Sequence, residues 1–241
     1  MRIGVIGTGV IATAVVHGIA SDGHQITVSE RSAANAVALD AAYDNVSVAG
    51  NQTVLDESDV VLLGLMAEQA PNVLSGLRFR NDQQVITFMA GLTLDQTAPL
   101  VAPAQMSAIV MPFPGVAQGR SLVMMQGDAA LVESIFAPAN RVFVCKDADE
   151  MQAYLTAQAV LSPAIKLVGG ASEWLGQRAS DKEGAEEFLR VLVGSSLLGG
   201  KCAPLLQALN TEGGYNQRLR LHMEESGMVE ALHEGLDKLE G

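Results

Sequence analysis

The chain has 241 residues, of which 49% are hydrophobic and 17% are charged, and its formal net charge is −12. This length can bury the core of one large domain or of two smaller ones. The negative charge would repel phosphate backbones and anionic membranes, so we expect neither nucleic acid nor a membrane as a partner.

The first 32 residues predict a strand, a glycine turn, a helix and a second strand. The strands are Arg2–Ile6 and Gln25–Ser29, and the helix runs from Val10 to about Ala20. The turn between strand and helix, Gly7-Thr8-Gly9-Val10-Ile11-Ala12, has the Gly-x-Gly-x-x-Ala form of a dinucleotide-binding fingerprint. We therefore expect a Rossmann-type βαβ unit at the start of the chain.

The small residues of this turn suit a pyrophosphate group. Gly7 permits the tight turn, Gly9 lets the backbone approach the phosphates, and Ala12 lets the helix pack closely on the strand. The free N–H groups at the helix start, helped by the helix dipole, would face the phosphates. The predicted cofactor contacts in this turn are Gly7, Thr8, Gly9, Val10 and Ile11.

The choice between NAD and NADP depends on the residues after the second strand. Glu30 favours the free 2′-hydroxyl of NAD, because a carboxylate accepts its hydrogen bond and repels a phosphate. Arg31 and Ser32 offer a guanidinium and a hydroxyl to the 2′-phosphate of NADP. The residues alone leave both cofactors open.

Alternating strand and helix signals continue to about residue 146. Several strands are continuous apolar runs, which are typical of parallel strands covered on both faces. We expect a doubly wound, mostly parallel sheet in a dinucleotide-binding domain of residues 1–146. The further strands are Val46–Val48, Val60–Leu65, Val85–Met89, Ser107–Met111, Leu122–Met125 and Val142–Cys145, and the helices are Ala33–Ala41, Glu68–Leu77, Leu94–Val101 and Ala129–Phe136, with Ser32 and Asp128 as caps of the first and last.

Residues 147–241 show helical periodicity and no convincing strand. Asp147 would cap the first helix, Ser162-Pro163 would bend or restart a long apolar one, and another would run from about Lys182 to Leu198. A short helix would begin at Pro204 and a final one would follow Gly213-Gly214. This helical domain is both short and strongly apolar. We therefore expect it to cover its exposed apolar face by pairing with a second copy of the chain.

Cysteines and histidines give no sign of a metal site or a disulfide framework. Cys145 and Cys202 have no partner spacing and are interpreted as small buried residues in a reducing compartment. The four histidines, His17, His24, His222 and His233, are isolated and predicted to have surface roles. The first strand begins at residue 2, which leaves no room for a signal peptide, so we expect a cytoplasmic protein.

Motifs along nearly the whole chain resemble those of the pyrroline-5-carboxylate reductases. They are the opening glycine turn, Glu30-Arg31-Ser32 at the cofactor ribose, Met89-Ala90-Gly91 after the fifth strand, Met111-Pro112 at the end of the sixth, Ser162-Pro163-Ala164 in the long helix and Thr211-Glu212-Gly213-Gly214-Tyr215-Asn216 near the C-terminus. The resemblance implies an NAD(P)H-dependent reductase of a small cyclic imino acid. Its leading substrate is Δ1-pyrroline-5-carboxylate, reduced to proline by hydride transfer to C=N.

The resemblance also favours NADP over NAD and implies an intertwined homodimer, with a ring of dimers as a further assembly. Strand ends and the C-terminal loop then supply the candidate site. We expect cofactor contacts at Leu65, Met66, Ala90 and Gly91, substrate contacts at Met111, Pro112, Phe113, Gly213, Gly214 and Tyr215, and catalytic roles for Asn216 on the substrate nitrogen and Thr211 on the carboxylate.

Departures from the family pattern leave other functions open. The Lys-Pro after the fourth strand is Met66-Ala67 here, the Asn after Met-Pro is Phe113, and the two threonines of the C-terminal loop are Tyr215 and Asn216. One alternative is another oxidoreductase on the same scaffold, either a hydroxyacid dehydrogenase that uses Lys166 or a deazaflavin-linked NADP reductase. Another is a non-catalytic NAD(P)-binding regulator.

Overall fold

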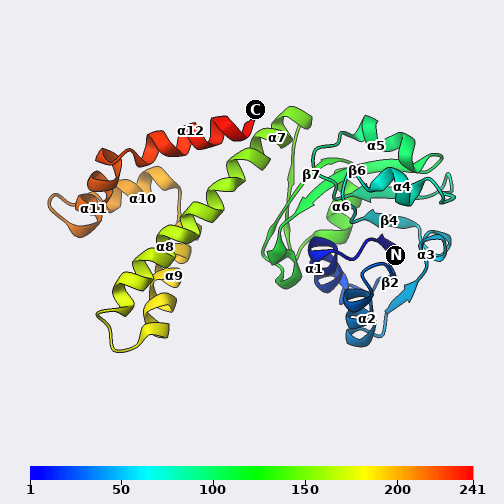
Figure 1. Cartoon of the computed structure of the whole chain (residues 1–241), viewed down its shortest axis with the longest axis horizontal. Coiled ribbons are helices and arrows are strands. Elements are labelled where there is room, and N and C mark those ends of the chain that lie inside the picture. The colour runs from blue at the N-terminus through cyan, green and yellow to red at the C-terminus, as the bar shows by residue number, and fades with distance from the viewer. Residues whose placement is uncertain (241) are drawn as a thin grey trace. The chain divides into compact units, whose positions relative to one another are not determined.

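The computed structural model describes residues 1–240 and divides into two compact units, Met1–Met151 and Gln152–Gly241. The first unit alternates strands and helices, and the second is helical throughout its described part (Figure 1). The strands are β1 (Arg2–Ile6), β2 (Gln25–Ser29), β3 (Val46–Ala49), β4 (Val60–Leu63), β5 (Gln84–Thr87), β6 (Gln105–Pro112), β7 (Leu122–Gly127) and β8 (Arg141–Val144). The predicted α/β class, with a helical region after the sheet, is confirmed.

The eight strands form one sheet in the order β3-β2-β1-β4-β5-β6-β7-β8. All neighbouring strands are parallel except β6 and β7, which pair antiparallel. The direction of winding reverses between β1 and β4, which makes their carboxyl ends the topological switch point. In doubly wound sheets ligands bind in the crevice at that point.

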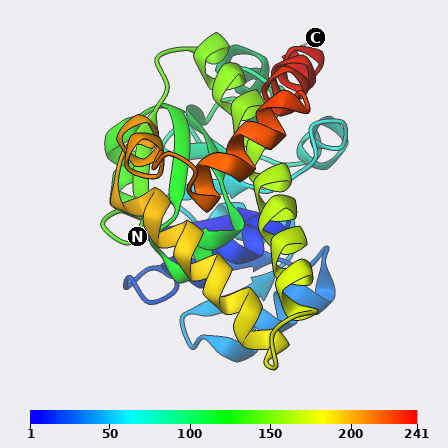
Figure 2. The same ribbon diagram turned by 90° about the vertical axis from the view of Figure 1, so that its left-hand side faces the viewer.

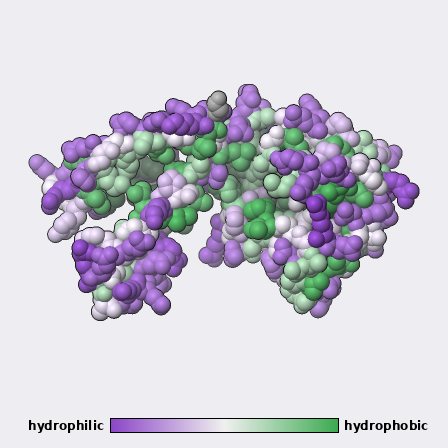
Figure 3. Space-filling model, in the orientation of Figure 1, coloured by the Kyte–Doolittle hydropathy of each residue, from purple (hydrophilic) through white to green (hydrophobic). Residues whose placement is uncertain are grey.

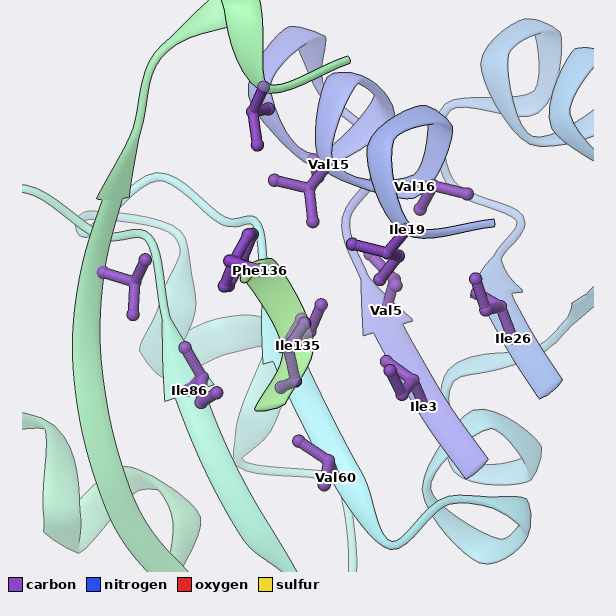
Figure 4. Packing of buried hydrophobic residues seen from close by; sticks show 14 of the residues in the cluster. Ile3, Val5, Val15, Val16, Ile19, Ile26, Val60, Ile86, Ile135 and Phe136 are labelled. Atoms are coloured by element: carbon purple, nitrogen blue, oxygen red, sulfur yellow. The ribbon is translucent and has the colours of Figure 1, made fainter. Parts of the chain in front are cut away.

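Helices cover both faces of the sheet, and each face has its own core. One core joins β-strand residues to α1 (Val10–Ile19), α2 (Ala33–Ala42) and α6 (Ala129–Phe136). In Figure 4, Val15, Val16 and Ile19 of α1 lie over Ile3 and Val5 of β1. The other core is built with α3 (Asn51–Glu57), α4 (Ala70–Leu74) and α5 (Leu94–Val101).

Alternation along β4 shows how one strand serves both cores. Val60 and Leu62 belong to the first core, whereas Val61 and Leu63 belong to the second. Successive side chains of a strand point to opposite faces, so a strand covered on both sides is apolar at every position. This explains why the predicted strands are continuous apolar runs.

The second unit contains antiparallel and crossing helices with much apolar surface. Its helices are α8 (Leu161–Gly176), α9 (Lys182–Gly199), α10 (Cys202–Ala208), α11 (Tyr215–Glu225) and α12 (Met228–Glu240). They follow α7 (Ala148–Ala157), within which the unit begins, and a short 3-10 turn, η2 (Gln158–Val160). Helices α8 and α9 meet at the turn between them (Figure 2). No described helix has the length and apolarity that crossing a membrane requires.

Several local predictions differ from the structure. Helix α3 and the 3-10 turn η1 (Pro114–Gln118) were not expected, α4 is only five residues long, and the single final helix is in fact two. Asp128 and Asp147 accept N–H bonds from Leu131 and Glu150 as caps do, but Ser32 makes no such bond at α2. The bond from Glu150 N–H lowers the pKa of Asp147.

Two predictions of burial were wrong. Cys202 is exposed at the start of α10, whereas Cys145 is buried as expected. Burial raises the pKa of the Cys145 thiol. His24 is only 6% exposed, and its Nε2 has no hydrogen-bond partner in the part of the chain that the structure describes, so a surface role does not fit it. The turn before β2 places the His24 side chain inside the protein. The residues next to an isolated histidine in the sequence do not reveal this burial.

Candidate functional site

The glycine turn after β1 packs directly on the end of β4. Gly7 has φ +91°, and a Cβ atom there would lie 2.5 Å from the carbonyl oxygen of Gly64. A Cβ at Gly64 would in turn lie 2.5 Å from the Gly7 carbonyl oxygen and 2.7 Å from the Cβ of Ala12. Two bare backbones and one methyl group therefore fill the switch point, which brings α1 close to the strand ends.

Gly9 differs from Gly7 because nothing in the chain requires a glycine there. Its φ of −70° and ψ of −178° suit any residue, and a Cβ atom would meet no described atom within 4 Å. The added methyl group would project into open space beside the start of α1. That open space is where a ligand could approach the backbone closely.

The amide groups around Gly9 have no acceptors of their own. Among the described residues, none accepts a hydrogen bond from the N–H of Thr8, Gly9, Val10 or Ile11. Helix α1 is ten residues long, and its N-terminus carries a partial positive charge that favours an anion. A glycine with open space above it and unpaired amides beside it fit the pyrophosphate of a dinucleotide.

Three polar side chains hold this turn, and the sequence reading missed all of them. The N–H of Gly7 donates to Ser29 Oγ at 2.8 Å, and the Thr8 carbonyl accepts from Asn35 Nδ2 at 2.7 Å and from Thr13 Oγ1 at 3.2 Å. Ser29 ends β2, Asn35 lies in the first turn of α2, and Thr13 lies in α1. Thr8 is fully buried, and its own hydroxyl has no hydrogen-bond partner among residues 1–240.

Glu30, Arg31 and Ser32 form the short loop between β2 and α2. Glu30 and Arg31 are exposed and Ser32 is half-buried. Neither charged side chain has an ion-pair or hydrogen-bond partner in the described part of the chain. Both are therefore free to contact the ribose end of a cofactor, and the geometry does not choose between a hydroxyl and a phosphate there.

The other predicted cofactor residues follow β4 and β5 at the same edge of the sheet. Leu65 is buried and packs against Gly7, whereas the Met66 side chain is 64% exposed. Ala90 and Gly91 are exposed, and Gly91 has φ +81°. Leu65 thus supports the glycine turn from below, and Met66, Ala90 and Gly91 offer surface at the strand ends.

The residues predicted for the substrate at the end of β6 are mostly covered. Met111 is 8% exposed and Pro112 is buried, whereas Phe113 is half-buried. Phe113 precedes η1, which lies against α1: a Cβ atom at Gly18 would be 2.4 Å from the Val116 carbonyl oxygen. Of these three residues, Phe113 is thus the one whose side chain a substrate could contact.

The C-terminal loop is braced from α11, which changes one expectation. The N–H of Gly213 donates to Gln217 Oε1 at 2.8 Å, and that of Gly214 donates to the Thr211 carbonyl at 2.9 Å. Both residues were expected to contact the substrate, but in this structure their amides already have acceptors. The N–H groups of Tyr215 and Asn216, at the start of α11, have none among the described residues.

The predicted side chains of this loop are exposed. Tyr215 is 90% exposed, Thr211 and Asn216 are exposed, and Gly213 has φ +70°. Asn210 Oδ1 accepts hydrogen bonds from Gln217 and Arg220, so the loop is held from both of its ends. Neither Asn216 nor Tyr215 makes a side-chain hydrogen bond within the described chain.

The helical unit also holds an apolar groove between α8 and the last two helices. Its volume is about 820 Å³, and its lining includes Pro163, Leu167, Met228, Leu232 and Leu236. Figure 3 shows this hollow lined by apolar residues. Lys166 lies on its rim and is exposed. No cluster of three or more metal-ligating side chains occurs among the described residues.

The chain resembles known proteins in sequence over one part and in fold over its full length. Residues 2–91 match a family model described as NADP oxidoreductase, coenzyme F420-dependent. A search of curated proteins finds no match. Among solved structures, a 1-pyrroline-5-carboxylate reductase from Streptococcus pyogenes superposes with a TM-score of 0.81 at 20% identity, covering 100% of this chain and 96% of its own.

The chain has the fold of the pyrroline-5-carboxylate reductases. A pyrroline carboxylate reductase from Plasmodium falciparum with NADP bound gives a TM-score of 0.83 at 14% identity, over 100% of this chain and 95% of that one. A reductive aminase from Aspergillus terreus in complex with NADPH and ethyl levulinate gives 0.58 at 22% identity, over 93% and 78%. The resemblance seen in the sequence is thus confirmed at the level of the pyrroline-5-carboxylate reductase fold.

Proposed function

We propose that the protein is an NAD(P)H-dependent reductase that transfers hydride to the C=N bond of a small cyclic imino acid, with Δ1-pyrroline-5-carboxylate as the leading substrate. The fold supports this assignment, because it covers the full chain and is shared by reductases of pyrroline carboxylate and by a reductive aminase. The family model covers only residues 2–91, within the dinucleotide-binding domain, so it supports the nicotinamide cofactor more than a deazaflavin partner.

The cofactor part of the proposal rests on Gly9. It has ordinary backbone angles and no neighbour that would exclude a side chain, so an external group is the remaining reason for a glycine. The unpaired amides of Thr8, Val10 and Ile11 give that group hydrogen-bond donors. We assign the pyrophosphate of NADP to this place, with Arg31 and Ser32 beside its 2′-phosphate.

The chemistry asks little of the protein. The nicotinamide supplies the hydride, and a protonated imine is already an electrophile. The chain's task is to orient the imine and exclude water. We assign Met66, Ala90 and Gly91 to the cofactor, and Phe113 to an apolar wall of the substrate pocket. We assign Asn216 to the imine nitrogen and Thr211 to the carboxylate, with the free amides of Tyr215 and Asn216 replacing those of Gly213 and Gly214 as anion donors.

The test is NADPH oxidation by the purified protein with a panel of acceptors. We expect turnover with pyrroline-5-carboxylate or pyrroline-2-carboxylate, and none with 2-keto acids run in parallel. Direct titration with NADPH and NADH separates the steps. Failure to bind either nucleotide at millimolar concentration would overturn the proposal at its base, and tight binding without turnover would favour a regulator.

A variant of Lys166 distinguishes the proposed imine reductase from a hydroxyacid dehydrogenase. It lies on the rim of an apolar groove, where its aliphatic stem can cover apolar surface while the ammonium stays in water. Lys166→Met should keep turnover of the imine within a few-fold. Loss of nearly all turnover in this variant would favour the hydroxyacid reaction.

We also propose that the protein works as a homodimer built by its helical unit. Large apolar side chains on α8 and α9 are exposed, among them Ile165, Trp174, Phe188 and Leu197. Together with the apolar groove, they form more exposed apolar surface than a monomer usually carries. An isologous contact with a second copy would cover both at once.

A further inference from the structure

Asn35 has no place in the cofactor assignments above, yet it contacts the phosphate turn directly. Its Nδ2 donates to the Thr8 carbonyl at 2.7 Å from the first turn of α2, 27 residues away in sequence. The partner is a carbonyl oxygen, so the donor must be the amide nitrogen, and the orientation of this side chain is fixed. Thr13 Oγ1 binds the same oxygen at 3.2 Å from α1.

The geometry of the peptide bond connects this contact to Gly9. In a planar trans peptide, the C=O of one residue and the N–H of the next point in opposite directions. Two donors from α1 and α2 hold the Thr8 carbonyl toward the protein. The N–H of Gly9 is therefore turned away from α1 and α2, and it has no acceptor within the described residues.

The peptide between Ile6 and Gly7 is held as well, but for a different purpose. The Ile6 carbonyl accepts from Gly64 N–H at 2.9 Å, and the Gly7 N–H donates to Ser29 Oγ at 2.8 Å. Both ends of this peptide are satisfied inside the protein, so it has nothing left for a ligand. The division between structural and ligand-facing amides thus falls between Gly7 and Thr8.

We propose that Asn35 is a positioning residue that aims the Gly9 amide at the pyrophosphate of the cofactor. This inference rests on the proposed cofactor site. Because Asn35 lies three residues after Ser32, the same bond ties the loop at the ribose end to the turn at the phosphate end. In this role Asn35 acts on the cofactor through the Thr8–Gly9 peptide and not by a contact of its own.

The chain offers a matched control in Asn45. Its Nδ2 also donates to backbone carbonyls, those of Ala20 and His24, each at 2.7 Å and part-buried, but before β3 and away from the glycine turn. Asn45→Ala loses two hydrogen bonds where Asn35→Ala loses one, so it should lower the melting temperature at least as much. Only Asn35→Ala should change the binding of the cofactor.

The experiment measures the Kd of NADPH and NADH by titration, with kcat and melting temperature for each variant. Asn35→Ala should weaken both nucleotides by about tenfold, because a lost or unpaired hydrogen bond is worth on the order of 1–2 kcal/mol. Asn35→Asp, which cannot donate at neutral pH, should weaken them at least as much. In both variants kcat at saturating cofactor should stay within about twofold, as expected for a change in binding alone.

Two results would overturn the inference. The first is equal effects of Asn35→Ala and Asn45→Ala on Kd, which would mean that Asn35 acts only through stability. The second is a loss confined to NADPH, which would place its action at the 2′-phosphate instead of the pyrophosphate shared by both nucleotides. If the unmodified protein binds neither nucleotide, it is the proposed function that fails, before Asn35 is tested.

Discussion

Single glycines in the phosphate turn have separable physical roles. Gly7 is required by the chain itself, since its φ is positive and the Gly64 carbonyl occupies the place of a side chain. At Gly9 the backbone angles and the described neighbours would accept a side chain. The two positions therefore allow stability and cofactor binding to be tested apart.

Gly9→Ala should fold normally and lose the cofactor. An alanine fits its backbone angles, so the melting temperature should change by only a few degrees, while Kd for NADPH rises at least about tenfold because the methyl group meets the phosphates. Gly7→Ala should instead lower the melting temperature sharply, because its Cβ would clash with Gly64. Thermal melts and nucleotide titrations of both variants check this. Unchanged NADPH affinity in Gly9→Ala would contradict the assignment of the pyrophosphate.

Arg31 tests the choice between the two nucleotides. A guanidinium beside a 2′-phosphate contributes to NADPH alone. Arg31→Ala should therefore raise KM for NADPH by about tenfold and leave KM for NADH nearly unchanged. Steady-state kinetics with each cofactor measures the ratio. An equal rise for both would show that Arg31 does not read the phosphate.

His24 gives the folded protein a dependence on pH. Burial lowers its pKa below the ordinary value of 6.5, so the unfolded chain takes up a proton more readily than the folded one. The free energy of unfolding should then fall as the pH drops below about 6.5. Denaturant unfolding of the wild type and of His24→Gln between about pH 7 and pH 5 measures this, and the variant should show the shallower slope. Identical slopes would rule out His24 as the source.

At the scale of elements, the packing of η1 on α1 connects the phosphate turn to the segment after β6. Gly18 allows this contact, because the Val116 carbonyl would be 2.4 Å from any Cβ atom there. Gly18→Ala should displace η1 and cost about 1–3 kcal/mol of stability, as overpacking does. Denaturant unfolding measures the loss. Because η1 follows Phe113, KM for the imine should rise as well, and a stable variant with unchanged kinetics would contradict this arrangement.

The opening elements could be predicted from sequence because their signals are local. The glycine turn, the apolar runs of β1 and β2, and the Asp128 cap each lie within a few residues of what they determine. Asn35 could not be predicted as part of the site, because its partner Thr8 is 27 residues away and only the docking of α2 brings them together. The hydrogen bond from the Gly213 amide to Gln217 spans only four residues. It could still not be predicted, because many polar side chains at this spacing could accept such a bond.

Short elements were missed for a different reason. Helix α3 has seven residues with two buried apolar side chains, Val54 and Leu55, too few to show a helical period. Its carboxyl end is held from outside, where Arg80 and Gln83 both donate to the Leu55 carbonyl. Tertiary contacts of this kind leave no mark in the segment that they stabilise.

At the scale of the whole molecule, the helical unit leaves much of its apolar surface exposed to solvent. The groove beside α8 and the exposed faces of α8 and α9 are predicted to be covered in a dimer. Leu167→Glu places a charge inside the groove and should convert the dimer to a monomer in sedimentation or light-scattering measurements. Glu173→Gln, also exposed on α8, serves as the control and should leave the dimer intact. A monomeric wild type would contradict the proposal.

The mutual contact of Gly7 and Gly64 has a consequence for protein engineering. Each backbone occupies the volume that the other residue's side chain would need, so enlarging one cannot be compensated by any choice at the other, which is already the smallest. A library randomised at both positions should return the original pair among its folded members. The contact between the residues that follow β1 and β4 therefore resists substitution on either side, and libraries that alter cofactor preference are best confined to residues 30–32.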